Sequence, residues 1–526
     1  MLKNKLSVIL ASALFTFSLL GAKPVYAKTT DNSNPNNSTV QEEVQKAKDS
    51  GQKVTIMYYC DADNNLEPHL LSDIDEMKKG YHNNPNLNLI TLVDRTPGYT
   101  NQKTTLGENF TDTRLYKIEH NKTERLDGGN EFPEITKNSN YEANMGNPDV
   151  LKKFINYCKA NYKADKYVLV MSNHGGGAKE KLKQNPKLKK AICWDYSNDE
   201  DCLYMPEISD HLNSSQSVDV LAFDACFMGT AEVAYQYKPG NGGFSADSII
   251  GSAPSVWGDG FQYDTIFNRI KKGGEVTNES DLTLGGKEKS FDPSTITNEE
   301  LGAIFVEEQR DCTKGDRYGY DQQLSFYDST KINSVKESID KLAINLSKEN
   351  KKAQIEDLRG SKTKSVKVMH YFDESQADYW ASYPYFDIYD LCEKINQSSN
   401  FSEETRTLAS NCMNKIDQMV VYSFENSYQS FKEGKNGLSI FLPDGDGEYK
   451  YGDWWSGYKT ISYRKLHTWY NSIDTVKEGL EPYGKLRWCK DGEDSRVNKV
   501  GNWFELLDSW FDSSNDSKGG VNHYQW

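Results

Sequence analysis

The sequence predicts an α/β fold with a mostly parallel, doubly wound central sheet and a large, partly helical C-terminal extension. Short aliphatic runs bounded by turn residues recur in the first half, which is the pattern of buried strands in parallel sheets. Helical patterns separate these runs, as expected when strands alternate with crossover helices. Two of the runs end in a reactive side chain, one at His174 and the other at Cys226. Because functional groups in such sheets lie just past the carboxyl ends of strands, these two residues mark a candidate site.

The N-terminal segment is predicted to direct export and to lie outside the folded part of the protein. Lysines precede an apolar stretch over residues 6–20, and small residues at 25–27 supply a cleavage site. This stretch is too short for a membrane span and fits a signal peptide, residues 1–27. Residues 28–50 are polar and cannot bury enough surface to fold alone, so they are interpreted as a propeptide. We therefore expect a soluble, secreted protein.

The folded part is predicted to begin near residue 53. Expected strands cover residues 54–59, 87–94, 167–174, 218–226 and 248–252, and expected helices cover about 67–79, 149–162 and 231–235. Residues 278–292 have the composition of a loop. Beyond Pro293 helical patterns dominate up to a further strand at 437–443, and the last stretch is rich in tryptophan.

The charge and the cysteine content of the chain favour some classes of function over others. The formal net charge is −15 and the pI is near 5.2, which argues against nucleic acid or anionic membrane as a partner. An acidic surface suits a secreted hydrolase with cationic substrates, although it also serves simply to keep a protein soluble. None of the nine cysteines falls in a CxxC pair, and the odd count leaves at least one thiol unpaired.

His174 and Cys226 are the candidate catalytic pair. If their strands are neighbours, the two backbones lie about 5 Å apart, and imidazole and thiol can meet over the sheet edge. A thiol needs a base or a lowered pKa to attack a carbonyl, and an imidazole supplies that base. The backbone amides of Gly175 and Cys226 are candidate oxyanion donors. Taken singly, the alternatives are a buried structural cysteine and a satisfied loop histidine.

Asp224 is a candidate for binding a basic substrate side chain. A carboxylate inside an apolar run is costly to bury without a partner. It is either capped by backbone amides or neutralises a guanidinium or ammonium group of the substrate. Trp257 and Asp259 follow the next strand and are candidates for the wall of the same pocket, with core packing and a turn carboxylate as the alternatives.

Four segments resemble the clostripain family in the caspase-like clan of cysteine peptidases. They are residues 59–66, 173–178, 222–226 and 437–443, and the resemblance extends over the whole chain. It implies a caspase-like α/β sandwich and a secreted endopeptidase that cleaves after arginine and is activated by calcium and thiol reductants. It also assigns His174 as the general base, Cys226 as the nucleophile and Asp224 as the acid that binds the P1 residue.

The resemblance further implies a precursor that cuts itself into a light and a heavy chain, which stay together non-covalently. The implied light chain at 51–179 forms the N-terminal half of the core, and an excised linker follows at 180–190. The heavy chain then consists of a catalytic half at 191–292 and a C-terminal region at 293–526. This last region completes the sheet and adds an aromatic-rich extension. Lys179 and Lys190 flank the linker where arginine is expected, and the linker contains no arginine. Either lysine is also accepted at P1, or high local concentration overcomes a poor cleavage site. An uncut basic surface loop is the remaining alternative.

Calcium is the cofactor that the resemblance implies, and two segments offer hard oxygen ligands. One, at the end of the first strand, contains Asp61, Asp63, Asn64 and Asn65, and the other is an acidic, glycine-rich turn at residues 444–448. Neither completes the twelve-residue EF-hand pattern. We take Asp61 and Asp63 as the candidate metal ligands, with a structural role as the alternative.

Two other functions remain open from the sequence. One is a peptidase that prefers lysine, which the linker residues favour. The other is a non-catalytic secreted binding protein that uses its aromatic-rich C-terminal half to hold carbohydrate or protein. The second leaves an unpaired thiol in an exported protein without a purpose.

Overall fold

The computed structural model describes most of the chain from Gly51 onward. The described ranges are 51–178, 191–273, 289–313, 322–361, 364–374, 383–443, 448–451, 459–462, 483, 486–491 and 500–511. The predicted signal peptide, propeptide and linker, and most of the acidic turn at 444–448, lie outside these ranges.

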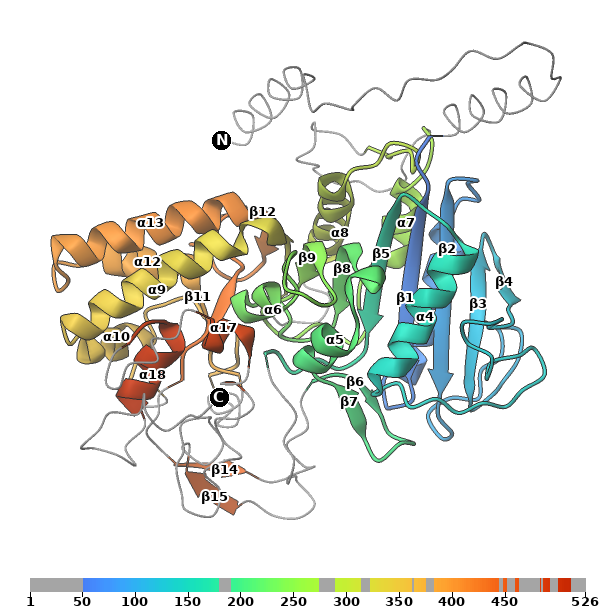
Figure 1. The fold of residues 1–526 in the computed structure, drawn as a ribbon, viewed down its shortest axis with the longest axis horizontal. Helices are drawn as coiled ribbons and strands as arrows, with labels where there is room; N and C mark the ends of the chain where they lie inside the picture. Colours follow the sequence, from blue (N-terminus) through green and yellow to red (C-terminus); the bar gives the residue numbers. More distant parts are fainter. Residues whose placement is uncertain are drawn as a thin grey trace, which may run out of the picture.

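A nine-stranded mixed sheet forms the centre of the molecule (Figure 1), with strand order β12-β10-β9-β8-β5-β1-β2-β3-β4. The strands are β1 (Val54–Ala62), β2 (Leu87–Arg95), β3 (Thr113–Glu119), β4 (Lys122–Arg125), β5 (Lys166–Ser172), β8 (Val218–Asp224), β9 (Ala246–Gly251), β10 (Gln323–Asp328) and β12 (Val420–Glu425). The five central strands run parallel, as predicted, whereas the pairings at both edges are antiparallel. Because β2 and β5 lie on opposite sides of β1, the strand order reverses between β1 and β5. Ligands of open α/β sheets bind at such a reversal.

Helices cover both faces of the sheet and give it two hydrophobic cores. One face packs against α3 (Glu67–Gly80), α7 (Tyr263–Arg269) and α8 (Asn298–Thr313), and the other against α4 (Pro148–Asn161), α5 (Met205–His211) and α6 (Ala231–Gln236). Side chains of each strand alternate between the cores, so Tyr58 contributes to the first and Tyr59 to the second. Because both faces of the central strands are buried, their sequences are continuous apolar runs.

The C-terminal region packs beside the β12 edge as a mainly helical unit (Figure 1). Its elements are η3 (Ser329–Lys331), α9 (Ile332–Lys348), α10 (Lys352–Arg359), β11 (Tyr385–Asp387), α12 (Ile388–Gln397), α13 (Glu403–Met419), β13 (Ser439–Phe441), β14 (Glu448–Tyr451), β15 (Lys459–Ser462), α17 (Arg487–Lys490) and α18 (Trp503–Phe511). The late strand expected at 437–443 is β13, which pairs with β11 outside the large sheet. A bridge from Ser439 to Thr230 ties it to the catalytic half. β10 and β12, also from this region, form one edge of the large sheet.

A short hairpin lies near the carboxyl ends of the central strands, and a short 3-10 helix lies at the amino end of β8. The hairpin β6 (Ile192–Asp195) and β7 (Asp201–Leu203) begins just after the predicted linker, and η2 (Ser214–Gln216) precedes β8. The hairpin contacts β1 and β5, so residues on both sides of the linker lie at the point where the strand order reverses.

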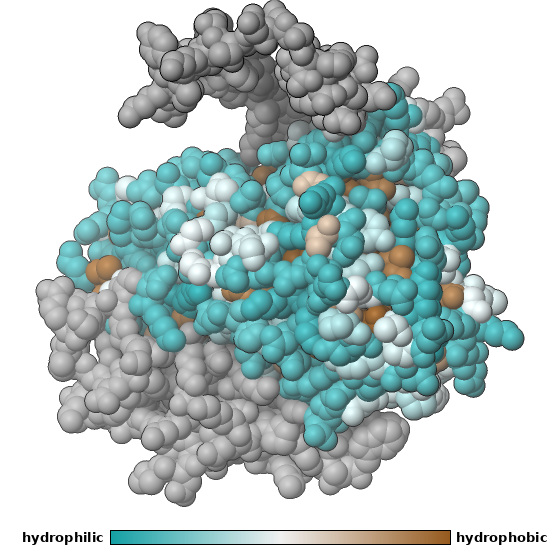
Figure 2. Space-filling model, turned by 45° about the vertical axis from the view of Figure 1, so that its right-hand side comes forward, coloured by the Kyte–Doolittle hydropathy of each residue, from teal (hydrophilic) through white to brown (hydrophobic). Residues whose placement is uncertain are grey.

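The face of the described part drawn in Figure 2 is mainly polar. Figure 2 shows one face, on which hydrophilic residues predominate and apolar residues are scattered. Among the described helices, none combines the length and the apolar character that a bilayer crossing needs. The large sheet with helices on both faces agrees with the α/β sandwich that the sequence predicts.

Candidate active site

Pairing of β5 with β8 brings His174 and Cys226 to the same edge of the sheet. The two strands are parallel neighbours, and Ser172 lies opposite Asp224. His174 and Cys226 each come two residues after this pair. The loops also touch, since a Cβ built on Gly175 would lie 2.2 Å from the carbonyl oxygen of Cys226. Glycine is therefore required where the two loops meet, and the predicted convergence of the two strand ends is found.

The thiol of Cys226 faces the segment that follows β9. Its sulfur accepts a hydrogen bond from the amide of Val256 at 3.3 Å, and the thiol faces the Val256 carbonyl at 3.8 Å. The Ser255 side chain and the Gly175 amide also interact with it. Burial nevertheless raises the pKa of the thiol, so the resting group is protonated and needs a base. Cys226 and Cys312 are the only cysteines that are not fully buried.

The imidazole of His174 is held as a neutral group. The residue is half-buried, and burial lowers its pKa to about 4. Its Nε2 lies 2.8 Å from Oδ1 of Asn65, and its ring centroid lies 5.6 Å from that of Trp194. A neutral imidazole is the form that can accept the thiol proton.

Asp224 lies below the sheet edge, on the α3 side. It is buried, and its Oδ2 accepts hydrogen bonds from the Phe261 amide at 3.1 Å and the Tyr263 hydroxyl at 2.8 Å. Burial raises its pKa to about 6. Gly260, at φ +61°, approaches so closely that a Cβ there would lie 2.6 Å from Oδ2. The backbone capping that sequence analysis left open is therefore present, and it leaves the carboxylate charged at neutral pH.

Two further carboxylates surround Asp224, and sequence analysis missed both. Asp73 and Glu76 project from α3, and the charges of Asp224 and Glu76 both raise the pKa of Asp73 after the effect of burial. Within the described part of the chain, Oδ1 of Asp73 is buried without a hydrogen-bond partner. Burial also raises the pKa of Glu76 to about 7. The available signal was an aspartate on the apolar face of a helix, spaced with Leu70, Ile74 and Met77.

Trp257 and Asp259 lie on the loop that closes over Asp224. Trp257 is buried, and its amide donates to Oε1 of Gln322 at 3.3 Å. Asp259 is partly exposed and pairs with His69, Oδ1 to Nδ1 at 3.1 Å. Its charge also acts on Asp73. The structure thus brings Asp224, Asp259, Asp73 and Glu76 into one acidic region beside the thiol, which we call the acidic pocket.

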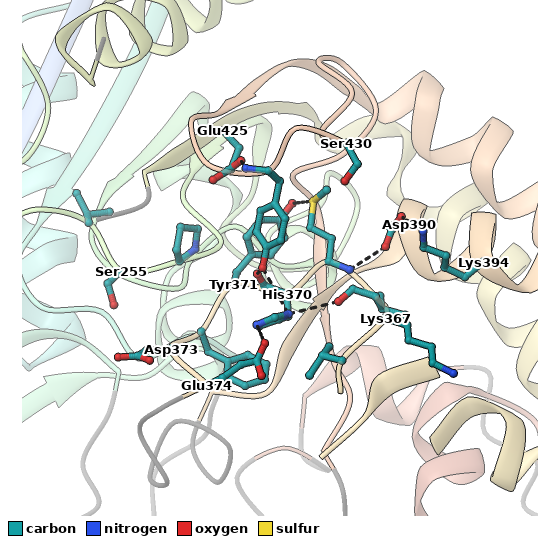
Figure 3. A pocket seen from close by; sticks show the side chains of 17 residues that line it. Ser255, Lys367, His370, Tyr371, Asp373, Glu374, Asp390, Lys394, Glu425 and Ser430 are labelled. Atoms are coloured by element: carbon teal, nitrogen blue, oxygen red, sulfur yellow. Dashed lines mark hydrogen bonds and ion pairs between the residues drawn. The ribbon is translucent and has the colours of Figure 1, made fainter. Parts of the chain in front are cut away.

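A cleft of about 890 Å³ lies between the segment after β9 and the C-terminal region (Figure 3). One wall is formed by Pro254, Ser255 and Val256, the segment that contacts the thiol. The opposite wall comes from the C-terminal region and includes His370, paired with Glu374 at 3.2 Å. Val256, which contacts the Cys226 thiol, thus also lines a cleft whose other wall is built by the C-terminal half.

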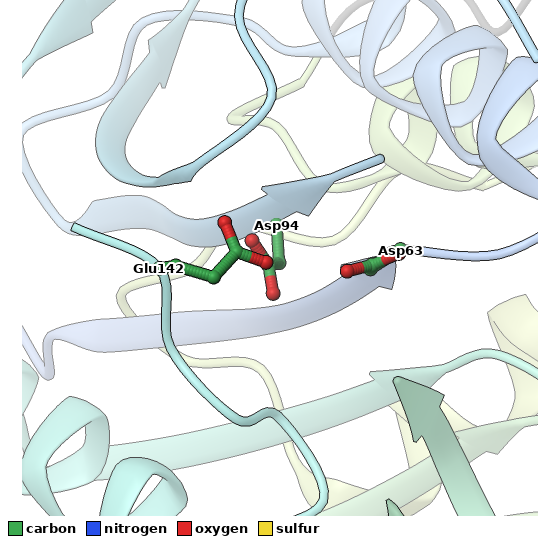
Figure 4. Close-up of side chains that lie close together, drawn as sticks. All are labelled: Asp63, Asp94 and Glu142. Carbon is green, nitrogen blue, oxygen red and sulfur yellow. The ribbon is translucent and has the colours of Figure 1, made fainter. Parts of the chain in front are cut away.

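A second acidic cluster lies at the carboxyl ends of β1 and β2 (Figure 4). Asp63, Asp94 and Glu142 each place one carboxylate oxygen within 4.8 Å of the others. Of the candidate ligands from the sequence, Asp63 belongs to this cluster, whereas Asp61 lies beside it and outside the group. Asp94 and Glu142 were missed, because neither has an acidic neighbour at a ligand-like spacing in the sequence.

Carboxylate oxygens in and beside the second acidic cluster are available to bind a cation. Among the described residues, Oδ1 of Asp63, Oδ2 of Asp94 and Oδ2 of Asp61 are buried without hydrogen-bond partners. Burial and the charges of Asp63 and Asp195 raise the pKa of Glu142 to about 8. Buried carboxylates without partners are costly, and hard divalent cations favour such oxygen ligands. The donor set therefore fits calcium.

The predicted processing residues Lys179 and Lys190 lie outside the described residues. The nearest described residues on either side of the predicted linker, Ala178 and Ala191, are both buried. The Ala178 amide donates to the Tyr385 hydroxyl at 3.0 Å.

The comparisons with known proteins agree with one another on the family of this chain. The family model described as the clostripain family, among the C11 peptidases, matches residues 58–510. The chain is 65% identical to clostripain from Hathewaya histolytica over 533 residues, covering 100% of both chains. It is also similar to two solved structures. An inactive zymogen C11 protease from Parabacteroides distasonis is 18% identical, with a TM-score of 0.49 over 84% of this chain and 98% of that chain. A secreted C11 cysteine protease from Bacteroides thetaiotaomicron, in complex with an irreversible peptide inhibitor, is 17% identical, with a TM-score of 0.48 over 74% and 92%.

Proposed function

The chain belongs to the clostripain family and is a cysteine endopeptidase, and we propose that it cleaves peptide bonds after basic residues with Cys226 as nucleophile and His174 as base. Family membership excludes the alternative of a non-catalytic binding protein. The positions of the two side chains at adjacent strand ends support the roles proposed for them.

The proposed reaction begins with a neutral thiol and a neutral imidazole. The Cys226 sulfur attacks the carbonyl carbon of the scissile bond while its proton passes to His174. The amides of Gly175 and Cys226 stabilise the resulting oxyanion. Collapse of this intermediate breaks the C–N bond, and His174 returns the proton to the leaving amine. Water then attacks the thioester with His174 as base, which releases the carboxylic acid and the free thiol.

The acidic pocket is the observation that carries the specificity proposal. Asp224 lies two residues before the nucleophile, and Asp73 adds a second buried carboxylate without a hydrogen-bond partner on Oδ1 among the described residues. Such groups repel one another unless a cation lies between them. A guanidinium or ammonium group of the substrate supplies that cation, and burial strengthens the attraction.

We propose arginine as the preferred P1 residue and lysine as an accepted one. A planar guanidinium can form several hydrogen bonds with a group of carboxylates, whereas an ammonium binds as a point charge. The lysines at both ends of the predicted linker support acceptance of lysine. A lysine-preferring peptidase is the competing proposal.

We further propose that the protein is secreted as a precursor, and that it cuts itself at Lys179 and Lys190 into a light and a heavy chain. The apolar N-terminal segment supports export. The cleft lined by Val256 supports polypeptide substrates, since it extends the contact surface beyond a single side chain.

We propose that calcium binds the second acidic cluster through Asp63, Asp94 and Glu142, next to Asp61. A bound calcium ion supplies positive charge that offsets the repulsion among these carboxylates. Asp61 lies near the end of β1 and Asp63 is the first residue of the loop to α3, so a cation bound here would also hold the start of that loop.

The proposal is tested with purified precursor of the wild type and of Cys226→Ala, with Cys312→Ala as the matched control. Cys226→Ala should lose cleavage of peptidyl-arginine amides and keep an intact linker, whereas Cys312→Ala should retain both activities. Asp224→Asn should reduce kcat/KM for arginine and lysine substrates by at least about 100-fold and should spare the low turnover of a matched glutamine substrate. Self-cleavage of Cys226→Ala, or equal losses on all three substrates, contradicts the proposal.

A further inference from the structure

A side-chain amide from a distant loop contacts the imidazole of His174. Oδ1 of Asn65, in the loop between β1 and α3, lies 2.8 Å from Nε2 of His174. The same oxygen accepts a hydrogen bond from the Tyr196 hydroxyl at 3.1 Å. We propose that Asn65 is a positioning residue that selects the tautomer of His174 and fixes the orientation of its ring, a role that rests on the proposed function of His174 as base.

The tautomer follows from hydrogen-bond chemistry. An amide oxygen only accepts hydrogen bonds, so Nε2 of His174 must donate to Asn65 and therefore carries the proton. Nδ1 is then the unprotonated nitrogen of the neutral imidazole. It is the one ring atom that can take the proton of Cys226. Without the amide oxygen the two tautomers compete, and the fraction of enzyme with a competent base falls.

The ring is also restrained on its face. Trp194 lies against the imidazole at 5.6 Å between centroids, and its amide donates to Oδ1 of Asn173 at 3.1 Å. The tilted contact with Trp194, at 52° between the ring planes, limits movement of the imidazole, and the hydrogen bond to Asn65 restrains its rotation about χ2. Two independent contacts thus define one ring orientation.

The loop that carries Asn65 is itself fixed by hydrogen bonds. The side chain of Asn64 donates to the carbonyl oxygens of Asp61 at 3.1 Å and Trp194 at 3.0 Å. The Tyr196 amide donates to the carbonyl oxygen of Asp63 at 2.9 Å. Asn65, Trp194 and Tyr196 are therefore placed together, although they come from two separate segments. An incidental surface contact would not need such support.

The test measures kcat and KM on a peptidyl-arginine amide for Asn65→Ala and for Asn65→Asp, which retains an acceptor. Asn268→Ala is the matched control, because Oδ1 of Asn268 likewise lies 3.1 Å from Nε2 of a histidine, His82, which has no proposed role in the reaction. We expect Asn65→Ala to lower kcat about 10- to 100-fold with KM within about twofold. Asn65→Asp should recover most of this loss, and Asn268→Ala should match the wild type.

A double-mutant cycle separates positioning from a general effect on folding. In a His174→Ala background, Asn65→Ala should cause no further loss of residual activity, because its effect acts through the imidazole. The proposal is overturned if Asn65→Ala retains wild-type kcat, if only KM changes, or if the loss is equally large without His174. Activity in Cys226→Ala would instead refute the proposed function itself, so the two failures are distinguishable.

Discussion

Gly175 lies directly against Cys226, and a Cβ on Gly175 would meet the Cys226 carbonyl oxygen at 2.2 Å and its amide nitrogen at 2.8 Å. The loops after β5 and β8 can approach this closely only because position 175 has no side chain. The contact fixes the distance between the base and the nucleophile, which come from different strands.

Gly175→Ala should therefore separate the two loops. A displacement of about 1 Å between reacting groups costs on the order of 100-fold in rate, so we expect a loss of at least that size in kcat. Titration of active sites and the melting temperature, measured together, distinguish misplacement from unfolding. Wild-type kcat in a folded Gly175→Ala variant would show that the close contact has no catalytic role.

The pKa of Asp224 predicts how arginine cleavage depends on pH. Burial raises this pKa to about 6, so the carboxyl is neutral below that pH and charged above it. Binding of a cationic P1 residue should weaken as the pH falls through about 6, which gives an acidic limb in kcat/KM near that value. In kcat the limb should lie lower, because the bound cation stabilises the carboxylate. A substrate with neutral P1 is the control, and the same limb near pH 6 for both substrates contradicts this assignment.

The ionisation state of the dyad predicts the pH dependence of alkylation. Burial raises the pKa of Cys226 and lowers that of His174 to about 4, so both groups are neutral in between. The rate of reaction with iodoacetamide, followed in the Cys312→Ala background, should keep rising as the pH increases toward the raised pKa of the thiol. A plateau between about pH 5 and pH 8 would instead indicate a thiolate–imidazolium pair.

Calcium should stabilise the protein through the second acidic cluster. A ligand that binds only the folded state adds about 2.7 kcal/mol at one hundred times its dissociation constant. We expect calcium to raise the melting temperature of the Cys226→Ala precursor. This variant is used because it cannot cleave itself during the measurement. Asp94→Asn and Glu142→Gln should abolish the increase, and the exposed Glu124→Gln should retain it. An unchanged increase in the first two variants would place calcium elsewhere.

The central part of the fold and the two catalytic candidates follow from local patterns. An apolar run that ends in one reactive residue identifies a buried strand and its functional end without knowledge of the partner strand. The edge strands β10 and β12 were not expected, because they interrupt a region in which helical periodicity dominates. Their pairing depends on contacts between segments about a hundred residues apart, which no local pattern records.

The residues that sequence analysis missed share one property. Asp73, Glu76, Asp94 and Glu142 have ordinary local surroundings, and they become unusual only when tertiary packing brings carboxylates from different elements together. Asn65 was noted only for its oxygen, since its partner His174 is far along the chain. Among these residues, only Asp73 gave a local sign of an unusual setting, because it lies on the apolar face of α3.

The central claim is that one thiol, assisted by His174, attacks substrates whose basic side chain occupies the acidic pocket. Incubation with a peptidyl-arginine chloromethyl ketone, followed by digestion and mass spectrometry, tests it most directly. We predict a single adduct on Cys226, formed much more slowly by His174→Ala and by Asp224→Asn. An adduct on any other residue, or no adduct on a folded and calcium-loaded enzyme, would contradict the claim.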